Sequence, residues 1–278
     1  MQLGVRAHDF GKLPVEELAH RIAAHGLTCV QLAVVKALAG IDTDAGRLSP
    51  GLACHVREAF AHHGIQIAVL GCYVNLADPD AATLRVQLGR FKEHLRLARD
   101  FGCSVVGTET GSLNSDFSWH PDNHGEAAFT TVLANVRELV REAEKFGVCV
   151  GVEGVERYVI DSPRRLRRLV DEVGSPNLQL ILDPVNLLNA RNHLDQAAIL
   201  EEAFALLGER IAILHAKDFV VEAGQFRPVP AGQGQLNYGL FLRRAKEHKP
   251  WISTLLEDTN PATIGESVRF MREAFARA

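Results

Sequence analysis

The chain has 278 residues, of which 47% are hydrophobic, and a formal net charge of −4 at pH 7. This length allows one large domain or two small ones. The acidic balance disfavours nonspecific nucleic-acid binding, which usually needs a basic surface, and no apolar run reaches the roughly 18 residues of a membrane span. The 5 cysteines form no Cys-x-x-Cys pair, which favours reduced thiols in a cytoplasmic protein over a disulfide framework or a cysteine zinc site.

Short apolar runs alternate with longer segments of helical periodicity along the whole chain. We predict strands at residues 3–5, 28–32, 65–70, 104–107, 148–153, 178–183, 211–215 and 251–257. The predicted helices occupy residues 15–24, 52–63, 81–101, 126–146, 163–173, 195–207, 238–248 and 264–276. Glycines such as Gly102 and Gly147 stand between a helix and the next strand, where a left-handed residue commonly closes a helix.

These strand–helix pairs predict an α/β fold, a single (β/α)8 TIM barrel over residues 1–278. Eight pairs in 278 residues average about 35 residues each (278/8), which is typical of that barrel, and no linker divides the chain. A doubly wound open sheet is the alternative. It would need a glycine-rich phosphate-binding fingerprint after an early strand, and the sequence contains none.

Four consecutive predicted strands end in a carboxylate or an imidazole: Glu153, Asp183, His215 and Glu257. Catalytic groups of such barrels stand at the carboxyl ends of the strands. Three carboxylates meeting in one pocket would repel one another, and a divalent cation would relieve that repulsion. Oxygen and imidazole donors suit Mn²⁺, our first expectation, or Mg²⁺, Co²⁺ and Zn²⁺, at one ion per chain. The alternative is that these residues cap helices or lie in solvated turns.

Other polar residues near the strand ends are candidates for supporting roles. Four are candidates for substrate contact, although each also fits an ordinary loop or cap position: His8, Glu109, Glu156 and Arg227. Lys217 and Asp218 follow His215 directly, and we predict that they form a salt bridge that supports this ligand.

The strand-end motifs resemble those of the xylose isomerase-like TIM barrel superfamily, and within it the ketose 3-epimerases. The resemblance covers nearly the whole chain and rests on Val152-Glu153, Leu182-Asp183-Pro184-Val185-Asn186, His215-Ala216-Lys217-Asp218, Leu256-Glu257 and the Gly-x-Gly segment within residues 229–238. It implies that Glu153, Asp183, His215 and Glu257 bind the metal. It also implies that the two glutamates act as acid and base on an enediolate formed from a sugar or polyol. Related barrels are often dimers or tetramers, so a homo-oligomer is expected.

One position departs from the epimerase pattern. Those enzymes carry a substrate-binding histidine three residues after the strand-six aspartate, and here that residue is Asn186. We expect Asn186 to contact the substrate as well, but its amide hydrogen-bonds without titrating near neutrality. The exact reaction therefore stays open between a sugar isomerase or epimerase and a keto-polyol dehydratase. An abasic-site endonuclease-like hydrolase is disfavoured because the additional metal-binding histidines are missing. A noncatalytic sugar-binding regulator is disfavoured because all four ligands are present.

Overall fold

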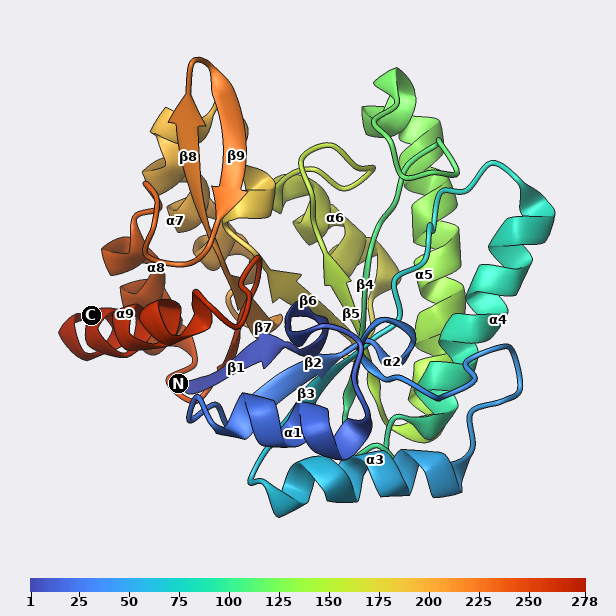
Figure 1. Ribbon diagram of the computed structural model, residues 1–278. Helices are drawn as coiled ribbons and strands as arrows, with labels where there is room; N and C mark the ends of the chain where they lie inside the picture. The colour runs from blue at the N-terminus through green and yellow to red at the C-terminus, as the bar shows by residue number, and fades with distance from the viewer.

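Eight parallel strands close into a barrel in the computed structural model, which describes residues 1–278 (Figure 1). Their order around the barrel is β1-β10-β7-β6-β5-β4-β3-β2, and the predicted (β/α)8 fold is confirmed. The barrel strands are β1 (Gln2–Arg6), β2 (Cys29–Leu32), β3 (Gln66–Gly71), β4 (Val105–Glu109), β5 (Cys149–Glu153), β6 (Leu178–Leu182), β7 (Ile211–Ala216) and β10 (Ser253–Leu256).

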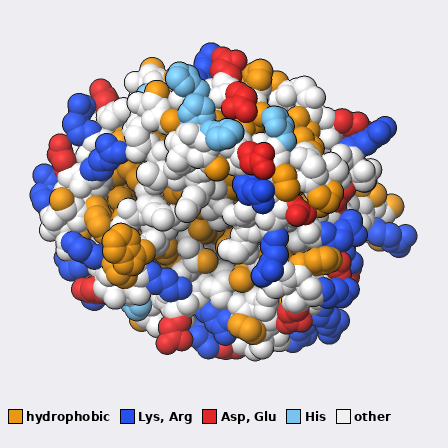
Figure 2. All heavy atoms as spheres, turned by 90° about the horizontal axis from the view of Figure 1, so that it is seen from below, with side chains coloured by type: hydrophobic (Ala, Val, Ile, Leu, Met, Phe, Trp, Pro, Cys, Tyr) orange, Lys and Arg blue, Asp and Glu red, His pale blue; other side chains and the backbone are white.

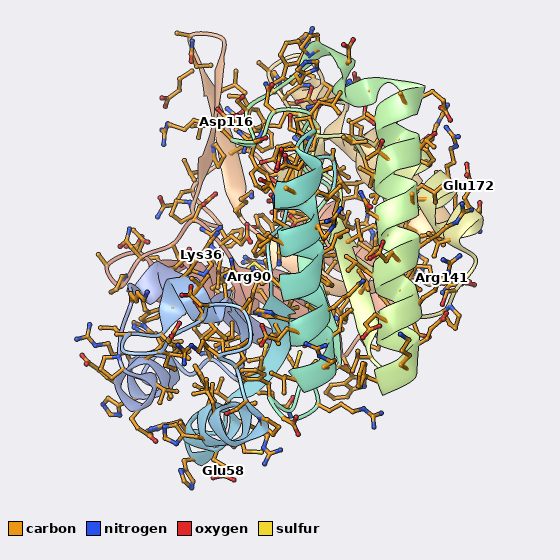
Figure 3. The ribbon with its side chains drawn as sticks, turned by 90° about the vertical axis from the view of Figure 1, so that its right-hand side faces the viewer. Lys36, Glu58, Arg90, Asp116, Arg141 and Glu172 are labelled. Atoms are coloured by element: carbon orange, nitrogen blue, oxygen red, sulfur yellow. The ribbon has the colours of Figure 1, made fainter.

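Helices cover the outside of the barrel because each presents one apolar face to the strands. In α5, the buried residues recur at helical spacing, as at Val132, Val136, Leu139 and Ala143. Figure 3 shows α4 and α5 side by side, with Asp116 in the loop near the upper end of α4. The helices are α1 (Val15–Ala23), α2 (Val34–Ala37), α3 (Pro50–His62), α4 (Ala81–Leu97), α5 (Glu126–Phe146), α6 (Pro163–Val173), α7 (Gln196–Leu207), α8 (Tyr238–His248) and α9 (Ile264–Arg277), with short 3-10 helices η1 (Ala7–Phe10), η2 (Pro121–His124), η3 (Val185–Leu187) and η4 (His193–Asp195).

The barrel interior is built in layers, because alternate residues of each strand point inward. One layer is apolar and consists of Cys29, Val69, Ile181, Ile213 and Leu255. Gly107 belongs to this level, since a Cβ there would lie 2.8 Å from Val69 Cγ1 and 2.9 Å from Ile181 Cδ1. Two residues further along the same strand faces, the next layer is polar and includes Gln31, Glu109, Glu153, Asp183, His215 and Glu257. The barrel geometry therefore gathers these side chains at its carboxyl end.

Two predicted boundaries are wrong, one by four residues and one by two. Helix α4 ends at Leu97 rather than at residue 101, because the chain turns before the left-handed Gly102 (φ 72°). Trp251, placed by its apolar character at the start of the last strand, is 82% exposed. Strand β10 begins only at Ser253.

A β-hairpin that the sequence did not predict projects beyond the barrel (Figure 1). It pairs β8 (Asp218–Glu222) with β9 (Gln225–Val229) in antiparallel register. Its two-residue turn places both Ala223 (φ 49°) and Gly224 (φ 76°) in the left-handed region, where Ala-Gly is a weaker signal than Asn-Gly. At its base, the Asp218 carboxylate accepts backbone N–H groups of Gly232 and Leu236 at 3.2 and 2.8 Å.

The face of the molecule turned away from the hairpin carries scattered charges of both signs, and histidines gather near one edge of it (Figure 2). The His20 and His63 rings pack edge to face, with centroids 5.7 Å apart. No group of three or more metal-ligating side chains forms around them. None of the helices has both the length and the apolar character required to cross a membrane.

Candidate active site

The four strand-end residues predicted as metal ligands converge in the structure. Nδ1 of His215 lies 3.3 Å from Oε1 of Glu153 and 3.2 Å from Oε1 of Glu257. All four side chains are buried, and the most exposed residue, Glu257, retains only 4% of its accessible surface. They come from four neighbouring strand ends, β5, β6, β7 and β10. Isolated caps or solvated turn residues would not show this burial and mutual contact.

Three of these residues suit a bound cation. Glu153, Asp183 and His215 each present one ligand atom, and these atoms lie within 4.8 Å of one another. Oδ1 of Asp183 accepts the backbone N–H of Val185 at 2.8 Å, whereas its buried Oδ2 lacks a well-aligned hydrogen bond and faces the Lys217 ammonium at 3.0 Å. Glu257 is not one of these three residues, but its carboxylate contacts Nδ1 of His215, the same nitrogen that Glu153 contacts. Two hard carboxylate oxygens, an imidazole nitrogen and a nearby third carboxylate fit a divalent ion.

The orientation of the His215 ring is set by Gln31. Nε2 of His215 lies 2.7 Å from Oε1 of Gln31, and an amide oxygen only accepts hydrogen bonds. Nε2 therefore carries a hydrogen, and Nδ1 faces the glutamates as the available ligand atom. The amide nitrogen of Gln31 in turn donates to the Tyr73 hydroxyl. The sequence analysis missed Gln31, although a polar residue in the otherwise apolar run Cys29–Leu32 was a visible signal.

The charges at the site shift the protonation equilibria of its members. Burial alone would lower the pKa of His215, but the carboxylates of Glu257 and Glu153 outweigh it and raise this pKa to about 9. Burial would likewise raise the pKa of Glu257, yet His215, Lys217 and Arg6 hold it well below its usual range. Burial raises the pKa of Asp183, although Lys217 opposes the effect. Without a metal, imidazolium and ammonium groups balance the carboxylates.

Lys217 does not form the predicted salt bridge with Asp218. Its ammonium nitrogen lies 3.0 Å from Oδ2 of Asp183 and donates to Oε2 of Glu257 at 3.1 Å. The cause is strand alternation, because residues 215 and 217 point to the same side of the chain while residue 218 points to the other. Asp218 therefore supports the hairpin base, and Lys217 contacts two of the predicted ligands, Asp183 and Glu257, directly.

A cavity of about 730 Å³ opens above this group. Four of the predicted substrate-contact residues line it: His8, Glu109, Glu156 and Asn186. Aromatic rings from separate segments form other parts of the wall, namely Phe117, Tyr158 and Phe226. A cavity wall that combines apolar surface with a few convergent polar groups is typical of a small-molecule site.

The polar lining residues are individually positioned. Nδ2 of Asn186 donates to Oε1 of Glu153 at 2.6 Å, and Nδ2 of Asn189 donates to Oε1 of Glu156 at 2.6 Å. Glu109 pairs in register with Glu153 across β4 and β5. Burial, with Glu153 and Glu257 adding to it, raises the pKa of Glu109 to about 7.

His8 lies on the β1 side of the cavity. Nδ1 of this ring is buried and has no hydrogen-bond partner. Burial, followed by the charges of Arg6 and Lys36, lowers its pKa to about 4. The ring is therefore neutral at physiological pH, with an unused polar atom at the cavity wall.

Arg227 does not reach the cavity, contrary to the sequence prediction. It lies on β9 between Phe226 and Pro228, which both line the cavity. Because neighbouring strand residues point to opposite faces, the Arg227 side chain turns outward. It is 60% exposed and lies 3.7 Å from the carboxylate of Glu222. The unpredicted hairpin is the reason for this error.

A family model of the xylose isomerase-like TIM barrel matches residues 19–274. This chain belongs to that family. It is 24% identical to the D-psicose 3-epimerase of Enterocloster bolteae over 208 residues, which is 72% of this chain and 63% of the relative. It is 25% identical to the probable L-ribulose-5-phosphate 3-epimerase UlaE of Mycoplasma pneumoniae over 182 residues, which is 66% of this chain and 55% of that protein. The chain thus matches less than two thirds of either relative's length.

Solved structures share the fold over almost the whole chain. A D-tagatose 3-epimerase-like protein superposes with a TM-score of 0.78 at 19% identity, covering 99% of this chain and 97% of the other. The IOLI protein, described with a bound zinc atom, gives a TM-score of 0.74 at 17% identity, covering 99% and 96%. At such identities the superpositions establish the barrel, and the chemistry must be argued from the residues present here.

Proposed function

We propose that this protein is a divalent-metal-dependent isomerase or epimerase of a sugar or sugar derivative. The observation that carries the proposal is the ligand group itself. Glu153, Asp183 and His215 bring their ligand atoms within 4.8 Å of one another, with Glu257 at the same imidazole nitrogen, beneath a cavity of about 730 Å³. The epimerase names of the relatives agree with this assignment.

The metal would be held by Glu153, Asp183, His215 and Glu257. When bound, it would supply Lewis-acid polarisation of a carbonyl oxygen and so acidify the neighbouring C–H bond. We expect one ion per chain, with Mn²⁺ preferred and Mg²⁺, Co²⁺ or Zn²⁺ as alternatives. The buried Asp183 oxygen, which faces a cation but has no well-aligned hydrogen bond, and the ring orientation imposed by Gln31 support a ligand role for these residues.

The two glutamates are proposed to move the proton. Their strands lie on different sides of β7 in the barrel order, so Glu153 and Glu257 approach the space above His215 from two directions. One carboxylate would take the proton beside the carbonyl, and the other would return a proton to the opposite face, which inverts that carbon. Asn186 holds Glu153 through its amide at 2.6 Å and is not expected to exchange protons itself.

The remaining lining residues are proposed to position the substrate. Glu109, Glu156 and His8 offer hydrogen-bonding groups to hydroxyls, and the Phe117 and Phe226 rings can pack against the less polar face of a sugar. The partner is therefore a small sugar or polyol. We also expect a homo-oligomer, either a dimer or a tetramer, which light scattering coupled to size-exclusion chromatography would measure.

Proton exchange tests the proposal most directly. Purified protein loaded with Mn²⁺ would be incubated in D₂O with ketoses, aldoses and keto-polyols, and deuterium incorporation followed by NMR. We expect incorporation at one carbon beside a carbonyl, together with binding of about one divalent ion per chain. A metal-stripped protein that retains full activity, or a protein that binds no divalent ion above neutral pH, would contradict the assignment.

A keto-polyol dehydratase is the second candidate, and Glu109 is the residue that favours it. Dehydration needs an acid for the departing hydroxyl, and the raised pKa of this cavity carboxyl, about 7, suits that task. The same NMR experiment distinguishes the two reactions, because dehydration removes a carbon–oxygen bond whereas epimerisation preserves the composition of the substrate. The endonuclease alternative is not favoured, since only one three-residue metal-binding group is present.

A further inference from the structure

One charged group at the site has no part in the proton transfers proposed above. Lys217 is only 6% exposed, yet it lines the cavity. Its ammonium nitrogen lies 3.0 Å from Oδ2 of Asp183 and 3.1 Å from Oε2 of Glu257. A buried lysine between two expected metal ligands is unusual, because its cation competes for the same carboxylate oxygens that a metal would use.

The position of Lys217 on the chain points its ammonium group toward the cavity, and one of its N–H donors has no partner in the protein. Lys217 follows β7 on the His215 side, and the Tyr238 hydroxyl fixes its carbonyl oxygen with a hydrogen bond of 2.9 Å. An ammonium group has three N–H donors. One is donated to Glu257 and a second direction faces Asp183, so the third remains for a molecule in the cavity.

The sum of the charges at the site indicates what this N–H donor could do. With a neutral His215, the carboxylates of Glu153, Asp183 and Glu257 contribute −3, and a divalent ion contributes +2, which leaves −1. The Lys217 ammonium brings the sum for these groups to 0, and Arg6, 3.7 Å from Oε2 of Glu257, adds a further positive charge at the edge of the site. Removing a proton beside a carbonyl places negative charge on the substrate oxygen, and a site that was already negative would oppose that step.

We propose that Lys217 is a further catalytic residue, whose ammonium group donates a hydrogen bond to the substrate oxygen that becomes negatively charged. This role rests on the isomerase or epimerase function proposed above. The lysine transfers no proton and remains an ammonium ion throughout. It stabilises the charged intermediate more than the neutral substrate, so its loss lowers kcat more than it raises KM.

The competing role is purely structural, in which Lys217 only holds Asp183 and Glu257 in place. The two roles predict opposite effects on metal binding. If Lys217 acts on the substrate, Lys217→Met removes a positive charge near the ion, and Mn²⁺ affinity stays constant or rises. If Lys217 is needed to hold the carboxylates, the same substitution lowers Mn²⁺ affinity together with activity.

The test compares wild type, Lys217→Met and the control Lys92→Met, in which a surface lysine paired with Glu138 at 2.6 Å is replaced. Mn²⁺ affinity is measured by calorimetry on the metal-free proteins, and deuterium exchange on the loaded ones. Binding of glycolohydroxamate, a planar anionic mimic of an enediolate, is compared with binding of glycerol. For Lys217→Met we expect about 10²–10³-fold slower exchange and weaker hydroxamate binding, with unchanged glycerol binding and undiminished Mn²⁺ affinity. Lys92→Met should match wild type.

Other outcomes of these measurements would overturn either the role of Lys217 or the proposed function. Exchange at the wild-type rate in Lys217→Met would overturn the role of Lys217 alone, and so would loss of Mn²⁺ binding in parallel with exchange. Absence of exchange in wild type would overturn the proposed function and this role with it. Should Lys217→Met not fold, Lys217→Arg retains the charge but moves the donors. A kcat at least about tenfold lower at unchanged Mn²⁺ affinity would then support the proposal, and a wild-type kcat would overturn it.

Discussion

Glu153 and Glu257 contact the same nitrogen of His215 but have different neighbours. Glu153 ends β5, and its Oε1 accepts a hydrogen bond from the neutral amide of Asn186 at 2.6 Å. Glu257 follows β10, and its Oε2 faces two cations, with Lys217 at 3.1 Å and Arg6 at 3.7 Å. Besides the shared His215 ring, Glu153 therefore has a neutral amide donor, whereas Glu257 faces two further cations.

The different neighbours suggest different roles for two glutamates that look equivalent in the sequence. Neutralising Glu257 removes the partner of two cations besides His215, which costs stability, whereas neutralising Glu153 affects only its pairing with His215. We therefore expect Glu257 to matter for folding as well as for chemistry, and Glu153 to matter mainly for chemistry.

The largest effect should come from replacing either glutamate by its neutral isostere. Glu153→Gln and Glu257→Gln each remove a metal ligand and a proton-transferring group, so deuterium exchange should fall at least about 10³-fold in both. Exchange rates measured at saturating Mn²⁺ would check this. A variant that keeps more than a tenth of the wild-type rate would show that its glutamate is not the acid or base.

Stability should separate the same two variants. Glu257→Gln leaves Lys217 and Arg6 without their shared carboxylate, although Lys217 keeps Asp183 at 3.0 Å and Arg6 keeps Asp9 at 2.7 Å. The loss of stability should therefore stay below the roughly 3–5 kcal/mol that a fully uncompensated buried charge costs. Glu153→Gln keeps a hydrogen-bonding group beside Asn186 and should lose clearly less. Urea unfolding of the metal-free proteins measures the difference. Equal losses in the free energy of unfolding would remove the contrast drawn between the two sites.

Gln31 offers the next test, because it orients the imidazole that both glutamates share. Gln31→Leu removes the acceptor 2.7 Å from Nε2 of His215, and loss of such a partner typically weakens metal affinity about 10–100-fold. Calorimetric titration with Mn²⁺ would measure this, with Gln179→Leu as a control at a glutamine that donates only to a backbone carbonyl. Unchanged affinity would mean that packing alone orients the ring.

The pH dependence follows from the charge on His215. Its pKa in the folded, metal-free protein is about 9, above the ordinary value of 6.5. The stability gained from its charged form is therefore fully present below about pH 6.5 and is lost as the pH rises through about 9. Metal affinity changes in the opposite direction, because the ligand must be neutral. Urea unfolding and Mn²⁺ titration at several pH values should show these opposing trends, and parallel trends would contradict them.

The sequence predicted the barrel and the four strand-end residues because both depend on local patterns. A buried strand followed by a polar residue is visible in the chain, and the fold converts eight such ends into one rim. The roles of Lys217 and Asp218 were not visible in the same way. Their difference arises from strand alternation and from the hairpin that starts at Asp218, which has only a weak turn signal. Gln31 was missed because its partner, His215, is 184 residues away in sequence.

The smallest expected effect concerns the hairpin and tests the placement of Arg227. Its outward side chain forms only a 3.7 Å pair with Glu222, and both are largely exposed, so the pair contributes at most about 1 kcal/mol. Arg227→Ala should therefore leave KM within about twofold of wild type. Phe226→Ala, at the adjacent position that lines the cavity, should raise KM more, since it removes apolar surface from the substrate wall. A larger KM for Arg227→Ala than for Phe226→Ala would show that the hairpin turns its other face toward bound substrate. Arg227 would then be assigned as a substrate-binding residue, as the sequence predicted.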